Sequence, residues 1–197
     1  MSNDIKWSID QTHSEINFKV RHLLISNVRG MFKTFDASIY TSGKDFKSAV
    51  IDLWIDTDSI TTGDVKRDEH LRSADFFDTE NFKQINFVAS TMEAADPDGN
   101  HALWGELTMK GITKNVKLLV AYGGIMKDPW GNEKAGFTVT GVINRTEWGL
   151  VWNATLETGG FMVSDDIYIE ADIQLINIGF KDLTMTLASV DDLESIQ

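Results

Sequence analysis

The chain has 197 residues, of which 42% are hydrophobic and 24% are charged, so it is long enough to bury a core without disulfides or a metal. Its 30 acidic and 18 basic residues give a net charge of -12, which argues against nucleic-acid binding and against docking on an anionic membrane surface, because both need a basic face. Cysteine is absent, which excludes thiol catalysis, disulfides and cysteine-ligated metal.

The N-terminal sequence carries no signal for export or membrane insertion. Met1 to Trp7 lack the apolar run of about 7–15 residues found in signal peptides, and no stretch approaches the ~18 apolar residues of a spanning helix. We therefore expect a cytoplasmic protein with no membrane insertion. If a leader has been removed from this chain, the expectation becomes a periplasmic protein, because a mature exported protein lacks the signal as well.

Apolar and polar residues alternate with a period of two along most of the chain. The alternation predicts strands, in chain order, over residues 16–22, 31–40 (the weakest), 51–55, 85–89, 103–109, 116–120, 137–143 and 167–173. Turn sequences rich in Gly, Asp, Asn and Pro separate several of them. One apolar and one polar face per strand is typical of an antiparallel sheet with one solvated side, so we expect a single all-β domain, either a sandwich or a closed barrel.

Helical signals are few. Residues 64–73 are rich in helix formers and show no alternation, and Thr61 or Thr62 is a candidate cap for this helix. A short turn is expected over residues 23–28. The tail over residues 182–197 is expected to form a last helix or to fray as an acidic end.

A series of short motifs follows in order along the chain. They are Trp7-x-Ile9-Asp10-x-x-His13-Ser14, Phe18-x-Val20-Arg21-His22, Val28-Arg29-Gly30-x-Phe32, Ser59-Ile60-x-Thr62, Arg67-Asp68-x-His70-Leu71-Arg72-Ser73-x-Asp75-Phe76-Phe77-Asp78, Gly105-x-Leu107-Thr108-x-Lys110-Gly111-x-Thr113-Lys114, Asn144-Arg145-x-x-Trp148-Gly149-Leu150-x-Trp152-Asn153 and Asp165-x-Ile167-x-Ile169. With these motifs the sequence from Trp7 to Leu175 resembles the YceI-like family of polyisoprenoid-binding, lipocalin-like proteins.

The resemblance implies an eight-stranded antiparallel lipocalin-like barrel with an apolar cavity and one short helix, over residues 1–176. Residues 177–197 form an extension that the resemblance does not explain. It also implies an amphiphilic lipid ligand, such as a polyisoprenoid, an isoprenoid quinone or a fatty amide, held with its tail inside. The resemblance implies a homodimer as well. Outward-facing Trp54 and Trp104 agree with this expectation, because burial of large exposed aromatic side chains in an interface is favourable.

Residues of inward parity, together with polar residues near the barrel ends, are the candidates for binding this ligand. They are Phe18, Val20, His22, Phe32, Leu53, Ile55, Arg67, Phe87, Leu107, Met109, Phe137, Val139, Gly141, Ile143, Arg145, Trp152, Phe161 and Ile169. Gly141 removes bulk from the inward face, which suits either a bend of the barrel or a ligand channel.

Three of these candidates are polar, and each allows two interpretations. His22 and Arg145 share the parity of the apolar residues in their strands, so each is either a contact for the lipid head or a satisfied interior polar group. Arg67 lies on the predicted helix, which either closes one barrel end through ion pairs such as Asp68–Arg72 or forms a lid whose Arg67 binds a phosphate or carboxylate head.

The sequence predicts no metal and no cofactor besides a bound lipid. The histidines at positions 13, 22, 70 and 101 have no metal-ligand spacing, although the first three are able to meet in space. Nucleophile motifs and glycine-rich phosphate loops are missing from the sequence too.

These observations favour a non-enzymatic lipid-binding barrel that serves carriage, storage or sensing. Two alternatives stay open. One is an enzyme that acts on a lipophilic quinone-like substrate through His22, His70 and Arg145. The other is a structural or stress protein whose barrel is filled by its own side chains.

Overall fold

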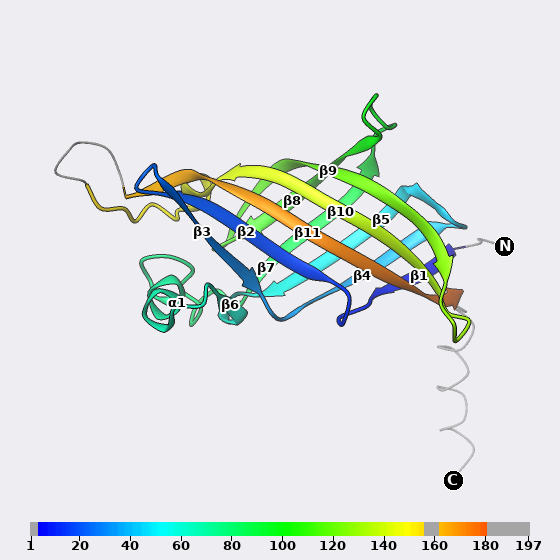
Figure 1. The fold of residues 1–197 in the computed structure, drawn as a ribbon, viewed down its shortest axis with the longest axis horizontal. Helices are drawn as coiled ribbons and strands as arrows, with labels where there is room; N and C mark the ends of the chain where they lie inside the picture. The colour runs from blue at the N-terminus through cyan, green and yellow to red at the C-terminus, as the bar shows by residue number, and fades with distance from the viewer. Residues whose placement is uncertain (1–3, 156–161, 181–197) are drawn as a thin grey trace, which may run out of the picture.

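Alternating side chains fold most of the chain into antiparallel strands that close into a barrel (Figure 1). The structure is a computed structural model, and it describes residues 4–155 and 162–180. The strands are β1 (Asp4–Ile9), β2 (Glu15–His22), β3 (Ser26–Phe32), β4 (Phe35–Ser42), β5 (Asp45–Asp56), β6 (Ile60–Thr61), β7 (Gln84–Met92), β8 (Asn100–Met109), β9 (Ile112–Lys127), β10 (Glu133–Asn144) and β11 (Val163–Phe180). The described residues also form helix α1 (Val65–Arg72) and the 3-10 turns η1 (Thr57–Ser59) and η2 (Arg145–Trp148).

These strands occupy eight positions around the barrel, because three positions are each shared by two successive strands. β1 and β2 lie end to end along β11, β4 and β3 lie beside them in the same way, and β6 continues the position of β5. The order of positions is β1/β2, β3/β4, β5/β6, β7, β8, β9, β10 and β11, and the pairing of β11 with β1 and β2 closes the ring. Each of the predicted strand segments lies in a different position. The predicted eight-stranded antiparallel barrel is confirmed.

In each of the three shared positions, a short non-strand segment separates the two strands and interrupts the barrel wall. These three interruptions lie side by side. They fall at residues 10–14, 33–34 and 57–59. The Lys33 amide donates a hydrogen bond to the carbonyl of Ser59 (3.3 Å), and the Asp56 amide donates to the carbonyl of Thr34 (2.9 Å), so the second and third interruptions are joined to each other. The interruption at residues 33–34 also explains the weak alternation over residues 31–40, because two short strands replace one continuous strand.

The first interruption is held by a buried carboxylate. Asp10 is 7% exposed and accepts hydrogen bonds from Lys134 Nζ (2.8 Å) and Gln174 Nε2 (2.9 Å). Burial by itself raises the pKa of Asp10, but hydrogen bonds from Lys134, Thr12, His13 and Gln174 outweigh it and hold the pKa well below its ordinary value. Asp10 is therefore ionised at neutral pH and links β10 and β11 to the end of β1.

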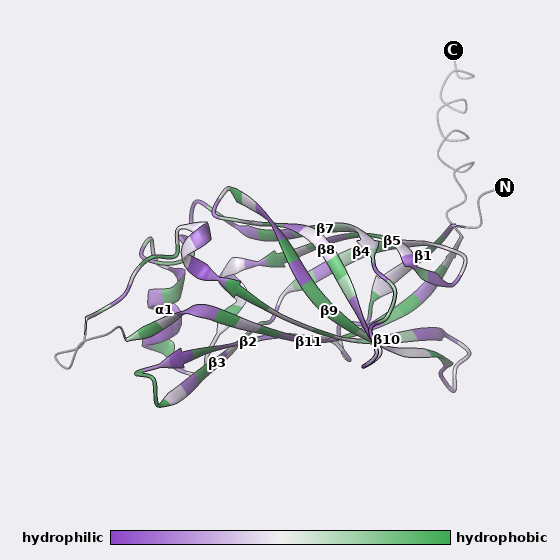
Figure 2. Cartoon of the chain, turned by 90° about the horizontal axis from the view of Figure 1, so that it is seen from above, coloured by the Kyte–Doolittle hydropathy of each residue, from purple (hydrophilic) through white to green (hydrophobic). Residues whose placement is uncertain are grey.

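The alternation predicted from sequence is visible along the strands as hydrophobic and hydrophilic residues in turn (Figure 2). The inward side chains form one continuous buried cluster. Close packing requires glycine at one inward position of β8: a Cβ at Gly105 would lie 2.5 Å from the ring of Phe87.

Strand β1 was not predicted, although its inward residues Ile5, Trp7 and Ile9 do alternate and are buried. β11 continues to Phe180, past the expected boundary of the barrel at residue 176. The turn expected over residues 23–28 is shorter, because β3 already begins at Ser26. The tail over residues 182–197 lies outside the described residues.

The predicted helix is present as α1, but its cap is different. The side chain of Asp64 accepts a hydrogen bond from the amide of Arg67 (3.0 Å), so Asp64 caps the helix in place of Thr61 or Thr62. The hydroxyl groups of both threonines donate instead to the carboxylate of Asp68. Within the described residues, no helix has the length and hydropathy needed to span a bilayer.

The ion pair that helical spacing allows between Asp68 and Arg72 is replaced by one between Arg72 and Asp58 (3.4 Å), although the charge of Arg72 still lowers the pKa of Asp68. The guanidinium of Arg72 donates to the carbonyls of Asp58 (2.8 Å) and Ile60 (2.7 Å). Since Ile60 belongs to β6, this contact fastens the helix to the barrel wall, and it is a tertiary contact that spacing along a helix does not reveal.

Candidate functional site

Two adjoining chambers occupy the interior of the barrel. We call them the inner chamber, about 170 Å³, and the outer chamber, about 440 Å³ and bordered by α1. Four wall residues belong to both: Ile16, Ile55, Leu107 and Ile169. Ile16 follows the first interruption of the wall and Ile55 precedes the third, so the chambers meet at the level of the interruptions.

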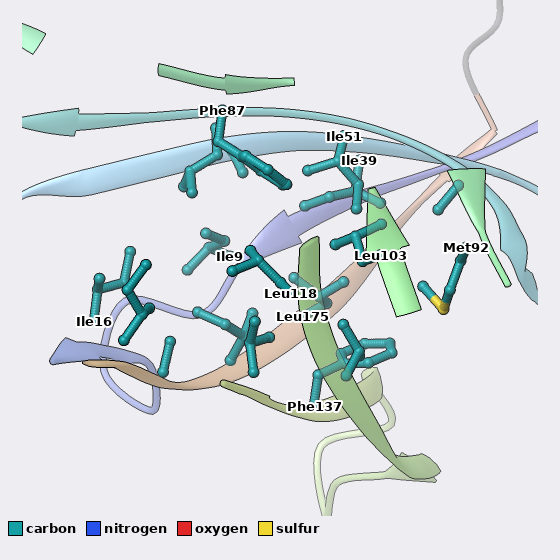
Figure 3. A pocket seen from close by; sticks show the side chains of 18 of the residues that line it. Ile9, Ile16, Ile39, Ile51, Phe87, Met92, Leu103, Leu118, Phe137 and Leu175 are labelled. Atoms are coloured by element: carbon teal, nitrogen blue, oxygen red, sulfur yellow. The ribbon is translucent and has the colours of Figure 1, made fainter. Parts of the chain in front are cut away.

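The wall of the inner chamber is entirely apolar. It consists of Ile, Leu, Val, Ala, Phe and Met side chains from β1, β2, β4, β5 and β7 to β11, several of which are labelled in Figure 3. Phe46 and Phe137 pack against each other here, with ring centroids 4.9 Å apart. A chamber of this kind offers no hydrogen-bonding partner to a polar group, so it accepts hydrocarbon and disfavours water.

The outer chamber adds polar side chains to an otherwise apolar wall. The polar residues are Asn17, His22, Thr62, Lys66, Arg67, His70 and Arg145. No Asp or Glu is among the described wall residues of either chamber. The cavity therefore changes along the barrel from purely apolar to apolar with basic groups. Lys66 and Arg67 are exposed, which shows that the outer chamber reaches solvent beside α1.

Arg145 lies in this wall but is occupied by the protein itself. It is 3% exposed, and it donates from Nε to the carbonyl of Ser164 (3.0 Å) and from Nη1 to the carbonyls of Leu150 and Trp152 (2.9 Å for Trp152). Its Nη2 donates to Asp165 (3.2 Å). Burial lowers the pKa of Arg145 from its ordinary value, and the charge of Asp165 opposes that shift. The geometry thus supports the structural interpretation of this arginine.

Two other basic groups of the outer chamber are also partly engaged. Arg67 donates from Nε to the hydroxyl of Thr62 (2.7 Å) and from Nη2 to the carbonyl of Thr62 (3.1 Å). Nε2 of His70 lies 3.0 Å from a carboxylate oxygen of Asp75, and the rings of His70 and Trp152 form a T-shaped contact with centroids 4.6 Å apart. These contacts fix the side of α1 that faces the chamber.

The structure places nearly all of the predicted ligand-contacting residues in the chamber walls. The predicted residues that line one or both chambers are Phe18, Val20, His22, Phe32, Leu53, Ile55, Arg67, Phe87, Leu107, Met109, Phe137, Val139, Ile143, Arg145, Trp152 and Ile169. Phe161 lies outside the described residues. Gly141 is in neither wall, but a Cβ at this position would lie 2.5 Å from Cδ2 of Leu118, which lines the inner chamber.

Several wall residues were missed. Ile9 on β1, Ala37 and Ile39 on β4, and Phe46 on β5 all line the inner chamber. The alternation of apolar and polar residues in β1 and β4 could have identified Ile9, Ala37 and Ile39 from the sequence. Lys66 of α1 was missed for a different reason, because a short helix with little amphipathic pattern does not indicate which side faces the barrel.

The histidines do not form a common site. His13 bonds to Asp10 (3.0 Å) at the first interruption, whereas His22 and His70 line the outer chamber, and His101 lies near the carbonyl of Glu93 (2.8 Å). Over residues 4–155 and 162–180, no group of three His, Asp or Glu side chains is arranged to hold a metal ion.

Comparison with known proteins places one domain over most of the chain. The YceI-like domain matches residues 7–175. The chain is 38% identical over 170 residues to the UPF0312 protein of Staphylococcus epidermidis, covering 86% of this chain and 96% of that protein. It is 31% identical to the solved YCEI protein of Campylobacter jejuni, with a TM-score of 0.66 over 85% of this chain and 95% of that one. A polyisoprenoid binding domain from Saccharophagus degradans, 14% identical, shares the fold with a TM-score of 0.59 over 87% and 98% of the two chains.

Proposed function

The chain belongs to the YceI-like family, and from that premise we propose that it binds one long-chain amphiphilic lipid inside the barrel and catalyses no reaction. The lipid tail occupies the inner chamber, and the head lies in the outer chamber beside α1. The observation that carries the proposal is the change of the wall from purely apolar to apolar with basic groups, which matches an amphiphile lying along the barrel. The fold shared with a polyisoprenoid binding domain agrees with this choice of ligand class.

The binding energy comes from the tail. Burial of each methylene contributes about 0.8 kcal/mol, so about ten methylenes contribute roughly 8 kcal/mol before the cost of immobilising the lipid. The polar groups of the outer chamber then set the orientation of the lipid. A polyisoprenoid, an isoprenoid quinone and a fatty amide all meet this description, and carriage, storage or sensing are the roles that need binding without chemistry.

The two alternative functions have less support. An enzyme that uses Arg145 needs guanidinium donors aimed at a substrate, whereas four of its five N–H groups are directed at carbonyls and at Asp165. A structural protein with a filled barrel needs a packed interior, whereas this interior holds chambers of about 170 and 440 Å³.

The test is native mass spectrometry of gently purified protein, followed by lipid extraction. We expect the wild-type protein to carry a long-chain lipid and the Val139→Trp variant, whose indole fills the inner chamber, to carry none. Val88→Trp is the matched control, because Val88 is exposed on the outside of β7. A wild-type protein that yields no lipid and takes up none from detergent solution contradicts the proposal.

A further inference from the structure

We infer that the head of the bound lipid is an anion, a carboxylate or a phosphate, and that Lys66 and His22 bind it in the outer chamber. The inference rests on the proposed lipid binding and adds the chemical class of the head. It begins from the basic groups that border the outer chamber and from the partners that each of them has.

Lys66 and His22 differ from the other basic groups of this wall. Over the described parts of the chain, neither the Lys66 ammonium nor the His22 ring has a hydrogen-bond or ion-pair partner, although both line the outer chamber. Arg67, His70 and Arg145 in the same wall each have protein partners. The outer chamber therefore presents two basic side chains for which the described protein supplies no partner.

The acidic groups of the neighbouring segment, Asp64, Asp68, Glu69 and Asp75, lie outside the wall of this chamber. The carboxylate of Asp64 accepts from the amide of Arg67, Asp68 accepts from two threonine hydroxyls, and Asp75 is paired with His70. No carboxylate lines the chamber among the described residues. A protein with a net charge of -12 thus lines its cavity, where it meets solvent, with basic side chains and with no carboxylate among the described residues.

An anionic head fits these groups better than a neutral head. Carboxylate and phosphate oxygens form charge-assisted hydrogen bonds with an ammonium group, and such bonds are about twice as strong as neutral ones. Arg67 lines the same chamber, and its Nη1 group has no protein partner in the described structure, so it supplies a further donor. A neutral head, such as an alcohol, offers the ammonium an uncharged acceptor and therefore a weaker hydrogen bond.

The experiment compares three lipids with the same C16 chain: hexadecanoic acid, hexadecyl phosphate and hexadecan-1-ol. Affinities are measured by displacement of the neutral dye Nile red. We expect the wild-type protein to bind at least one of the two anions about tenfold or more tightly than the alcohol, as expected for a hydrogen bond to a charged group. The acid and the phosphate then distinguish the two possible heads.

Variants of Lys66 and His22 test whether these two residues cause the preference for an anion. Lys66→Gln and His22→Leu should each weaken binding of the preferred anion by about three- to tenfold and weaken binding of the alcohol by less, so that the ratio of the two affinities falls. Lys114→Gln is the control, because Lys114 is an exposed lysine on β9 that lies in neither chamber wall. Circular dichroism confirms that the variants are folded.

The outcomes separate this inference from the function it rests on. Equal affinity of the wild-type protein for the alcohol and both anions, or a preference for an anion that survives in both variants, overturns the anion site and leaves lipid binding intact. Failure of all three lipids to displace the dye contradicts lipid binding itself, and the anion site with it.

Discussion

The Nζ atom of Lys134 lies 2.8 Å from a carboxylate oxygen of Asp10, and the two residues are 124 positions apart in the sequence. Asp10 follows β1 and Lys134 belongs to β10, so this ion pair reaches across β11, which lies between those strands. The two side chains are 8% and 18% exposed, which limits screening by solvent. The pair therefore fastens the interrupted part of the wall to its continuous part.

The ion pair predicts a specific dependence of stability on pH. The pKa of Asp10 is lowered in the folded state from its ordinary value of 3.8. As the pH falls, the Asp10 carboxylate is therefore protonated at a higher pH in the unfolded chain than in the folded protein. The stabilisation is fully present above about pH 5 and is lost as the pH falls through and below 3.8. Urea unfolding should show wild-type protein more stable than Asp10→Asn by about 1–3 kcal/mol at neutral pH, with a difference that shrinks in acid.

The control for this measurement is Asp52→Asn, since Asp52 is exposed on β5 and its side chain has no partner in the described structure. Its difference from wild type should be small at every pH. A difference between wild type and Asp10→Asn that stays constant down to about pH 3 would show that Asp10 does not carry this stabilisation.

Replacement of Arg145 should chiefly destabilise the protein. The Arg145→Lys variant keeps the charge but loses the planar fork that reaches Ser164, Leu150 and Trp152 together, so we expect the free energy of unfolding to fall by about 2–4 kcal/mol. Arg29→Lys, an exposed position on β3, should cost less than about 0.5 kcal/mol. Chemical denaturation of both variants tests this, and similar midpoints for the two would contradict it.

Gly141 and Leu118 should behave as a coupled pair. A Cβ at Gly141 would lie 2.5 Å from Cδ2 of Leu118, so Gly141→Ala should destabilise the barrel by about 1 kcal/mol, because the Leu118 side chain has to turn away from its preferred rotamer. In the double variant with Leu118→Ala, the new methyl group has room, so this cost should disappear. A double-mutant cycle measured by thermal unfolding checks this, and additive effects of the two substitutions would be the contrary result.

The homodimer stays a prediction. Trp104 is 43% exposed, but its Nε1 donates to Glu93 (2.9 Å) and the Lys117 ammonium lies 5.7 Å from its ring centroid. These contacts cover part of the indole within one chain, so less apolar surface of Trp104 remains to be buried in a dimer. Sedimentation velocity at micromolar concentration should show a dimer that Trp104→Ser shifts toward monomer; a wild-type protein that sediments only as a monomer argues against the dimer.

The sequence by itself determined the strands and the side chains that face the interior. Side chains alternate across a strand with a period of two, so the local pattern around residues such as Phe18, Val139 and Ile169 already specifies their face. The ordered motifs determined the family, because they are local sequence features that can be recognised without knowledge of contacts between distant residues.

Only the tertiary structure decided which polar side chains lack a protein partner and how much empty volume remains inside the barrel. Arg145 and Lys66 are both basic residues near the outer chamber, yet one is occupied by carbonyls and the other has no partner in the described structure. Their partners come from other elements of the fold, and local patterning carries no information about them. The chambers likewise depend on how side chains from all eight strand positions fill one interior, which is a property of the closed barrel and of no single strand.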